Sequence, residues 1–103
     1  MKTWAGKGDF KYNGSVDSGT TITYGSKQSR VSVTADDYSL LRQSFLNQTV
    51  HIGTSRDNRP RGSLGQWLEQ NVTRTAIASY VGPILIAEGY AKKVGDHKIR
   101  IIR

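Results

Sequence analysis

Apolar and polar residues alternate in two neighbouring stretches near the amino terminus, and this pattern predicts a β-hairpin. The stretches TTITYG and SRVSVT alternate β-branched or aromatic residues with polar ones, and only SKQ separates them. The buried face of this hairpin is expected to hold Ile22, Tyr24, Val31 and Val33. Five glycines lie between residues 6 and 25, so we expect irregular turns before the hairpin, up to about residue 20.

A different spacing of apolar residues predicts two short amphipathic helices. In TADDYSLLRQSFLNQ, Thr34 is a suitable N-cap, and two aspartates follow in the first turn, where the helix dipole favours negative charge. Tyr38, Leu41 and Phe45 share one face of this helix. In SLGQWLEQN, Ser63 and the glutamine three residues later have capping-box spacing. The buried side of this second helix is expected to hold Leu64, Trp67 and Leu68.

A five-residue strand, TVHIG, and a polar loop, TSRDNRPRG, lie between these two helices. His51 alternates with the apolar residues of the strand and is therefore expected to be exposed. The loop carries Arg56, Arg59 and Arg61 shortly before a helix start, which is a favourable place for an anion. We therefore expect these three arginines to contact phosphate.

The last third of the chain predicts a longer helix followed by a hairpin. The stretch VTRTAIASYVGPILIAEG predicts a helix over Thr73–Glu88, kinked or divided at Pro83 and stopped by Gly89. After it, YAKKV and HKIRII alternate around Gly-Asp and predict a hairpin with a two-residue turn. We expect the closing strand to pair with the TVHIG strand, because the two have matching alternation.

From Thr34 onward the predicted order is helix, strand, helix, helix, strand, tight turn, strand, with EGY after the last helix and IRI in the closing strand. This order and the EGY…IRI pattern resemble the winged helix-turn-helix family over residues 34–103. The resemblance implies a winged helix-turn-helix domain over residues 34–103. Residues 1–33, a glycine-rich segment and a β-hairpin, resemble no family that we can name, and we expect them to extend this α+β domain within one compact unit. The resemblance also implies DNA binding, with Thr73–Glu88 in the major groove and Tyr90–Ile102 as the wing.

The charge of the chain is suited to a polyanionic partner. Fifteen Lys and Arg against eight Asp and Glu give a formal net charge of +7, and nine of the fifteen lie in residues 56–103. The chain has no cysteine and no apolar run long enough to span a membrane. We therefore expect a cytoplasmic protein that is held together by packing alone and does not associate with membranes.

The candidate nucleic-acid-binding residues come from the loop, the last helix and the wing. They are Arg56, Arg59, Arg61, Arg74, Thr75, Ser79, Lys92, Lys93, His97, Lys98 and Arg100. Opposite its apolar side, the helix offers small residues with only Arg74 beside them to read guanine, so we expect phosphate contacts to dominate and sequence selectivity to be weak. The same smooth face is equally suited to pack against the N-terminal hairpin or a second subunit.

No arrangement of residues suggests catalysis. Asp36 and Asp37 are adjacent at a helix start and point in different directions, and two histidines without cysteine have no metal-binding spacing. Trp4 and Phe10 are expected to be tethered core residues. We therefore expect no enzyme activity, no cofactor and no metal.

Two functions remain open from the sequence. The first is a nucleic-acid-binding module that acts on duplex DNA with weak selectivity. The second is a protein-interaction adaptor or homodimerisation module on the same winged-helix scaffold. Strongly salt-dependent binding to unrelated duplexes favours the first, whereas a concentration-dependent change in size without DNA binding favours the second.

Overall fold

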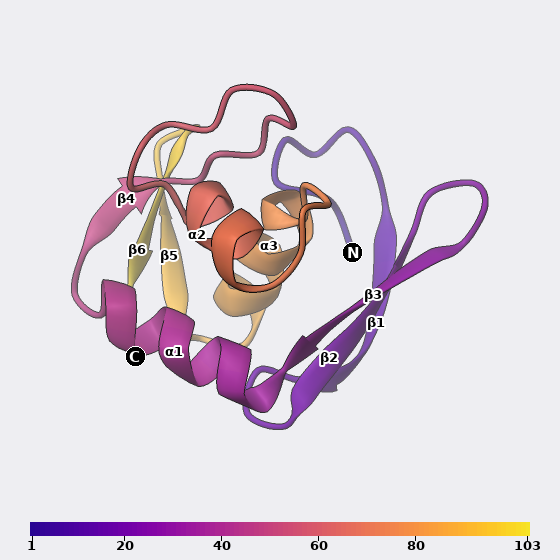
Figure 1. Ribbon diagram of the computed structural model, residues 1–103, viewed down its shortest axis with the longest axis horizontal. Coiled ribbons are helices and arrows are strands. Elements are labelled where there is room, and N and C mark those ends of the chain that lie inside the picture. The colour runs from indigo at the N-terminus through magenta and orange to yellow at the C-terminus, as the bar shows by residue number, and fades with distance from the viewer.

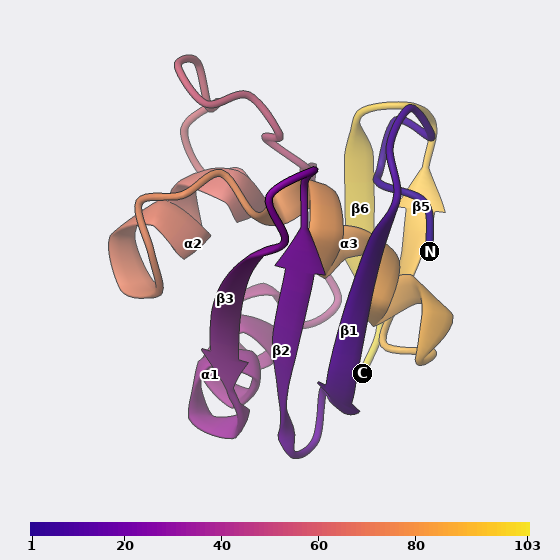
Figure 2. The same ribbon diagram turned by 90° about the vertical axis from the view of Figure 1, so that its right-hand side faces the viewer.

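The computed structural model describes residues 1–103 and has an α+β fold of three helices and two small antiparallel sheets (Figure 1). The elements are β1 Phe10–Ser15, β2 Gly19–Tyr24, β3 Ser29–Thr34, α1 Ala35–Phe45, β4 Thr49–His51, α2 Leu64–Asn71, α3 Ala78–Ala87, β5 Ala91–Val94 and β6 Lys98–Ile101. Helix α3 lies between the two sheets, and α1 runs along the bottom of the view in Figure 1 (Figures 1 and 2). None of the helices has the length and apolar character that crossing a membrane requires.

The first sheet is a meander in the order β1-β2-β3, with one strand more than the sequence predicts. The predicted hairpin is confirmed as β2 and β3, with Ile22 paired to Val31. Ile22 and Val33 are fully buried, whereas Tyr24 and Val31 are half-buried. The turns predicted before residue 20 are present at residues 4–8 and 16–18, but they are wrong for residues 10–15, where β1 pairs with β2 along its whole length.

The second sheet has the order β4-β6-β5, and β4 pairs antiparallel with β6, as predicted from their alternation. The hairpin of β5 and β6 is also present. Its strands pair up to Val94 and Lys98, so the connecting loop has three residues and the predicted two-residue turn is wrong. Gly95 in this loop has a φ of +65°, a conformation that favours glycine.

Side-chain caps fix the start of α1 and of α2. Thr34 Oγ1 accepts a hydrogen bond from Asp37 N at 3.0 Å, and the Asp37 carboxylate accepts one from Thr34 N at 3.0 Å, which completes a capping box. Ser63 Oγ accepts from Gln66 N at 3.0 Å, but the Gln66 side chain accepts from the backbone of the residue before Ser63. Both predicted apolar faces pack into the core, although Trp67 is only half-buried.

Helix α3 is shorter than predicted and runs through Pro83 without dividing. It starts at Ala78, because residues 73–77 serve as the connection that brings the chain from α2 to α3; the predicted start at Thr73 is wrong. Pro83 has no N–H, which leaves the Ser79 carbonyl without its helical donor. The backbone N–H of Trp4 donates to that carbonyl instead, at 2.9 Å. The proline thus leaves a carbonyl free to bind the N-terminal segment, residues 1–9, which precedes β1.

Trp4 connects the N-terminal segment to α3 and to the β5–β6 hairpin. A β-carbon on Gly82 would lie 2.8 Å from Ile52 Cδ1 and 2.9 Å from Trp4 Cε3, so the indole packs where only a glycine leaves room. The indole N–H donates to the Asp96 carbonyl at 2.7 Å. Trp4 and Phe10 are both buried, which confirms their prediction as core residues.

Two tyrosine hydroxyls join the first sheet to the helices. The hydroxyls of Tyr38 in α1 and Thr20 in β2 are hydrogen-bonded at 2.7 Å inside the core. Tyr12 in β1 donates to the Glu88 carboxylate at 2.8 Å, just beyond α3. Burial raises the pKa of Tyr12 to about 12, with the bond to Glu88 adding to this effect, and burial likewise raises the pKa of Tyr38. Both hydroxyls are therefore held in the protonated form.

Candidate nucleic-acid interface

The second sheet turns one of its two faces outward, and three cations lie there. Alternation along the strands sends Ala91, Ile99 and Ile101 into the core and their neighbours to the other side. Cross-strand pairing arranges these neighbours in two rows: Thr49, Arg100 and Lys92 in one, and His51, Lys98 and Val94 in the other. All six are exposed. We call these six residues the cationic sheet face.

The cations of this face are free to bind a partner. No carboxylate belongs to the cationic sheet face, and Lys92, Lys98 and Arg100 form no ion pair. Their one side-chain hydrogen bond within the protein joins Arg100 Nη1 to Thr49 Oγ1, at a long 3.4 Å. An incoming phosphate therefore does not have to displace an established partner, and the three positive charges attract polyanions.

The remaining two residues predicted for the wing lie outside this face. Lys93 Nζ donates to the Trp4 carbonyl at 3.2 Å and lies 4.7 Å from the centre of the indole ring. Its ammonium group thus holds the N-terminal segment in place. His97 lies in the loop that connects β5 and β6, at the end of the sheet.

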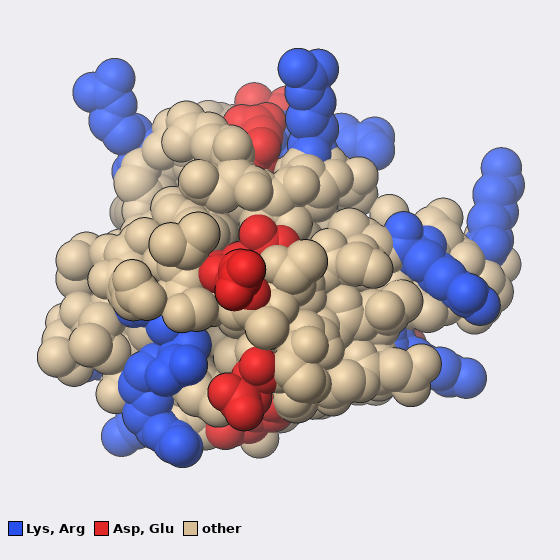
Figure 3. Space-filling view, turned by 60° about the horizontal axis from the view of Figure 1, so that its bottom comes forward, with Lys and Arg blue, Asp and Glu red and all other residues tan.

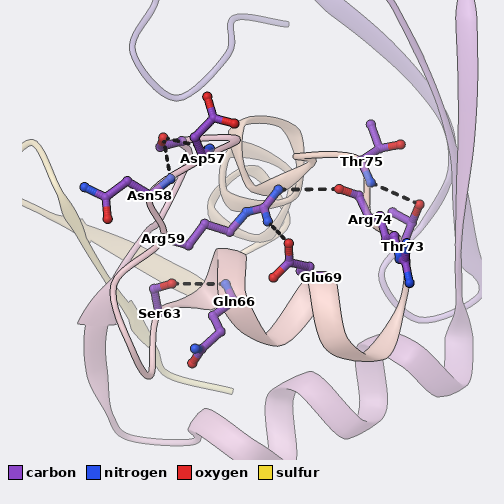
Figure 4. A network of polar contacts seen from close by, with 10 residues as sticks. Asp57, Asn58, Arg59, Ser63, Gln66, Glu69, Thr73, Arg74 and Thr75 are labelled. Atoms are coloured by element: carbon purple, nitrogen blue, oxygen red, sulfur yellow. Dashed lines mark hydrogen bonds and ion pairs between the residues drawn. The ribbon is translucent and has the colours of Figure 1, made fainter.

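The sequence pattern gives the same prediction for all three loop arginines, but their surroundings in the structure differ. Arg56 and Arg61 are exposed. The Arg59 side chain is only 6% exposed; it forms an ion pair with Glu69 of α2 and donates to the Arg74 carbonyl at 3.5 Å (Figure 4). Arg59 therefore fixes the loop against α2 and against the α2–α3 connection. Only Arg56 and Arg61 remain available to a phosphate.

The residues predicted on the last helix do not form an exposed helical surface. Arg74 and Thr75 are exposed, but they lie on the connection before α3. Ser79 is half-buried in the first turn of α3, and the small residues Ala78 and Gly82 are buried. The N-terminal segment of the same chain covers this smooth face, so α3 presents no cation with which to read bases.

We call the polar loop of residues 54–62 the arginine loop. A polar pocket of about 270 Å³ lies between this loop and the end of the second sheet. Both histidines of the chain, His51 and His97, line it together with Thr54, Ser55 and Asn58. The predicted exposure of His51 is confirmed, but no spacing in the sequence links the two histidines, because the β4–β6 pairing brings them together. No group of three His, Cys, Asp or Glu side chains that could hold a metal ion is present.

The side of the molecule formed by α1 has a mixed charge. Figure 3 shows acidic side chains along the middle of this side and cationic side chains projecting from its edges. The cationic sheet face differs, because its charged residues all have one sign. Its charge pattern is therefore better suited to a polyanion.

No family model, curated protein or solved structure matches this chain. We therefore infer its function from the arrangement of its own residues. That arrangement consists of the cationic sheet face and of Arg56 and Arg61 on the loop that follows β4.

Proposed function

We propose that this protein binds nucleic acid, duplex DNA in particular, through the phosphate backbone and with weak sequence selectivity. The observation that carries the proposal is the cationic sheet face, on which Lys92, Lys98 and Arg100 are exposed and have no carboxylate partner. In the winged-helix arrangement that we propose for residues 34–103, this face belongs to the wing and to the strand beside it.

The affinity comes from phosphate neutralisation, which releases counterions that are condensed on the nucleic acid. The lysines act as point charges, while the planar guanidinium of Arg100 can bind two phosphate oxygens at once. Arg56 and Arg61 extend the contact beyond the sheet. Because the smooth face of α3 is covered, base edges are left largely unread, and contacts to the backbone alone carry no sequence information.

A salt-dependent titration of two charge-matched variants tests this proposal. The first variant combines Lys92→Ala, Lys98→Ala and Arg100→Ala on the cationic sheet face. The control combines Lys11→Ala, Lys27→Ala and Arg30→Ala, which removes two lysines and one arginine, all exposed, from the first sheet and its turn. Both variants lose three positive charges, so a general effect of net charge is the same in each.

Each phosphate contact contributes about 0.9 to the slope of log K against log salt. The first variant should therefore lose up to about 2.7 units of slope on duplexes of unrelated sequence, while the control keeps nearly the full slope. Equal losses in the two variants would contradict a dedicated face. A protein that changes size with concentration but binds no duplex would instead support the protein-interaction adaptor.

A further inference from the structure

The polar pocket beside the cationic sheet face is lined with hydrogen-bond donors that the protein itself leaves free. The Ser55 hydroxyl oxygen accepts hydrogen bonds from Asp57 N at 3.3 Å and from Asn58 N at 3.1 Å. A hydroxyl oxygen has two acceptor lone pairs and one proton, so the Ser55 proton remains to be donated. The pocket therefore contains at least one hydroxyl whose unused capacity suits an acceptor.

The other side chains that line the pocket have the same free capacity. Thr54 and Asn58 make no side-chain hydrogen bond within the protein, and neither do the imidazoles of His51 and His97. A hydroxyl, an amide and a neutral imidazole can each donate at least one hydrogen bond. Donors from the end of β4, the arginine loop and the β5–β6 loop thus surround one space.

The lining of the pocket carries no charge that would repel an anion. No carboxylate lines the pocket. Two carboxylates are close in the sequence, Asp57 on the loop and Asp96 beside His97, and both belong to exposed residues outside the lining. Two cations are equally close, Lys98 opposite His51 across the strands and Arg56 after Ser55 in the loop, and they too lie outside the lining.

We propose that this pocket binds a phosphate monoester, namely the terminal phosphate of a nucleic-acid strand whose backbone lies on the cationic sheet face. The inference rests on the proposed function, because the strand brings its end to the pocket. A phosphate monoester carries about −1.5 to −2 charges at neutral pH and three strong acceptor oxygens. Hydroxyl, amide and imidazole donors from three segments match those oxygens, and such groups are common phosphate ligands.

The test compares two duplexes that are identical except for a 5′-phosphate or a 5′-hydroxyl at their ends. The protein should bind the phosphorylated duplex about tenfold more tightly, the factor expected from one additional charge-assisted hydrogen bond. The variant Thr54→Val, Asn58→Ala should lose this preference and still bind the 5′-hydroxyl duplex like the parent. Asn13→Ala, which removes an exposed amide from the first sheet, should keep the preference.

Inorganic phosphate provides a second, direct probe of the pocket. Its addition should shift the NMR signals of the His51 and His97 imidazoles, whereas chloride at equal ionic strength should not. Equal, salt-dependent affinity for both duplexes would overturn the strand-end site and leave the proposed function standing. If phosphate shifts the imidazoles but the two duplexes bind equally, the pocket takes small phosphates and the strand-end proposal is wrong. Failure to bind either duplex would overturn the proposed function itself.

Discussion

The ion pair between Arg59 and Glu69 should respond very differently to the loss of one partner or the other. The Arg59 side chain is 6% exposed, whereas the Glu69 side chain is 43% exposed. Water can solvate Glu69 when its partner is removed, but it has little access to the guanidinium. We therefore expect Glu69→Ala to destabilise the protein more than Arg59→Met.

The exposed fractions set the expected size of each effect. Arg59→Met keeps most of the aliphatic stem and leaves a carboxylate that water reaches, so the cost should be near that of an exposed ion pair, about 1 kcal/mol. Glu69→Ala leaves a buried guanidinium with one carbonyl contact of 3.5 Å. Loss of one partner of a fully buried pair costs about 3–5 kcal/mol, and the open side of this pair reduces that to about 2–3 kcal/mol.

Urea unfolding of the parent and of each variant measures these costs as changes in the free energy of unfolding. Gln70→Ala is the control for Glu69→Ala, because it introduces alanine at the next, exposed position of α2 and removes no ion pair. Equal destabilisation by Glu69→Ala and Arg59→Met, or a larger effect of Arg59→Met, would refute the argument from exposure.

Arg59→Met, compared with a double variant of Arg56 and Arg61, tests which arginines of the loop contact nucleic acid. Arg59→Met should retain the salt slope of duplex binding, because its guanidinium is already engaged by Glu69. Arg56→Ala with Arg61→Ala should lower that slope by up to about 1.8, because each phosphate that is no longer neutralised removes about 0.9. A reduced slope in Arg59→Met with the fold intact would place Arg59 at the nucleic acid.

Two further predictions concern the packing of the N-terminal residues. Gly82→Ala should lower the free energy of unfolding by about 1–2 kcal/mol and change the fluorescence of Trp4, since its β-carbon would lie 2.9 Å from the indole. Gly8→Ala is the control, because its β-carbon would lie at an ordinary 3.5 Å from the nearest atom. This control should be nearly neutral in thermal unfolding. The folded protein holds the pKa of Tyr12 at about 12, above the ordinary value of 10.0, so the protonated hydroxyl stabilises the fold below pH 10 and this contribution is lost as the pH rises to about 12. Urea midpoints measured across that window should fall less steeply in Tyr12→Phe than in the parent, and identical slopes would contradict the link.

Local patterns in the sequence predict those parts of the fold that depend on near neighbours. The capping box at Thr34 and the β2–β3 hairpin need only residues within a few positions of one another. The β4–β6 pairing is not local, but matching alternation in the two strands predicts it correctly. Once that register is known, the cationic sheet face follows, because alternate residues of each strand share one side.

The parts that the sequence does not reveal depend on distant contacts. The glycines near residue 14 suggest turns, yet Gly14 and Gly19 belong to the paired strands β1 and β2, where they adopt positive φ values. The burial of Arg59 depends on Glu69 across the loop, so three arginines in one loop look alike in the sequence. The smooth face of α3 is covered by Trp4, and no pattern around residue 82 indicates a partner near residue 4.

The position of Trp4 also determines when the chain can finish folding during synthesis. The meander of the first sheet can form early, because its strands are consecutive. Trp4, however, precedes these strands, and its indole N–H donates to the Asp96 carbonyl, 92 residues later in the chain. Its binding site does not exist until the β5–β6 hairpin has left the ribosome, so the Trp4 indole stays unpacked while the chain between the two is made. Chaperones that bind exposed apolar side chains thus have a long opportunity at Trp4.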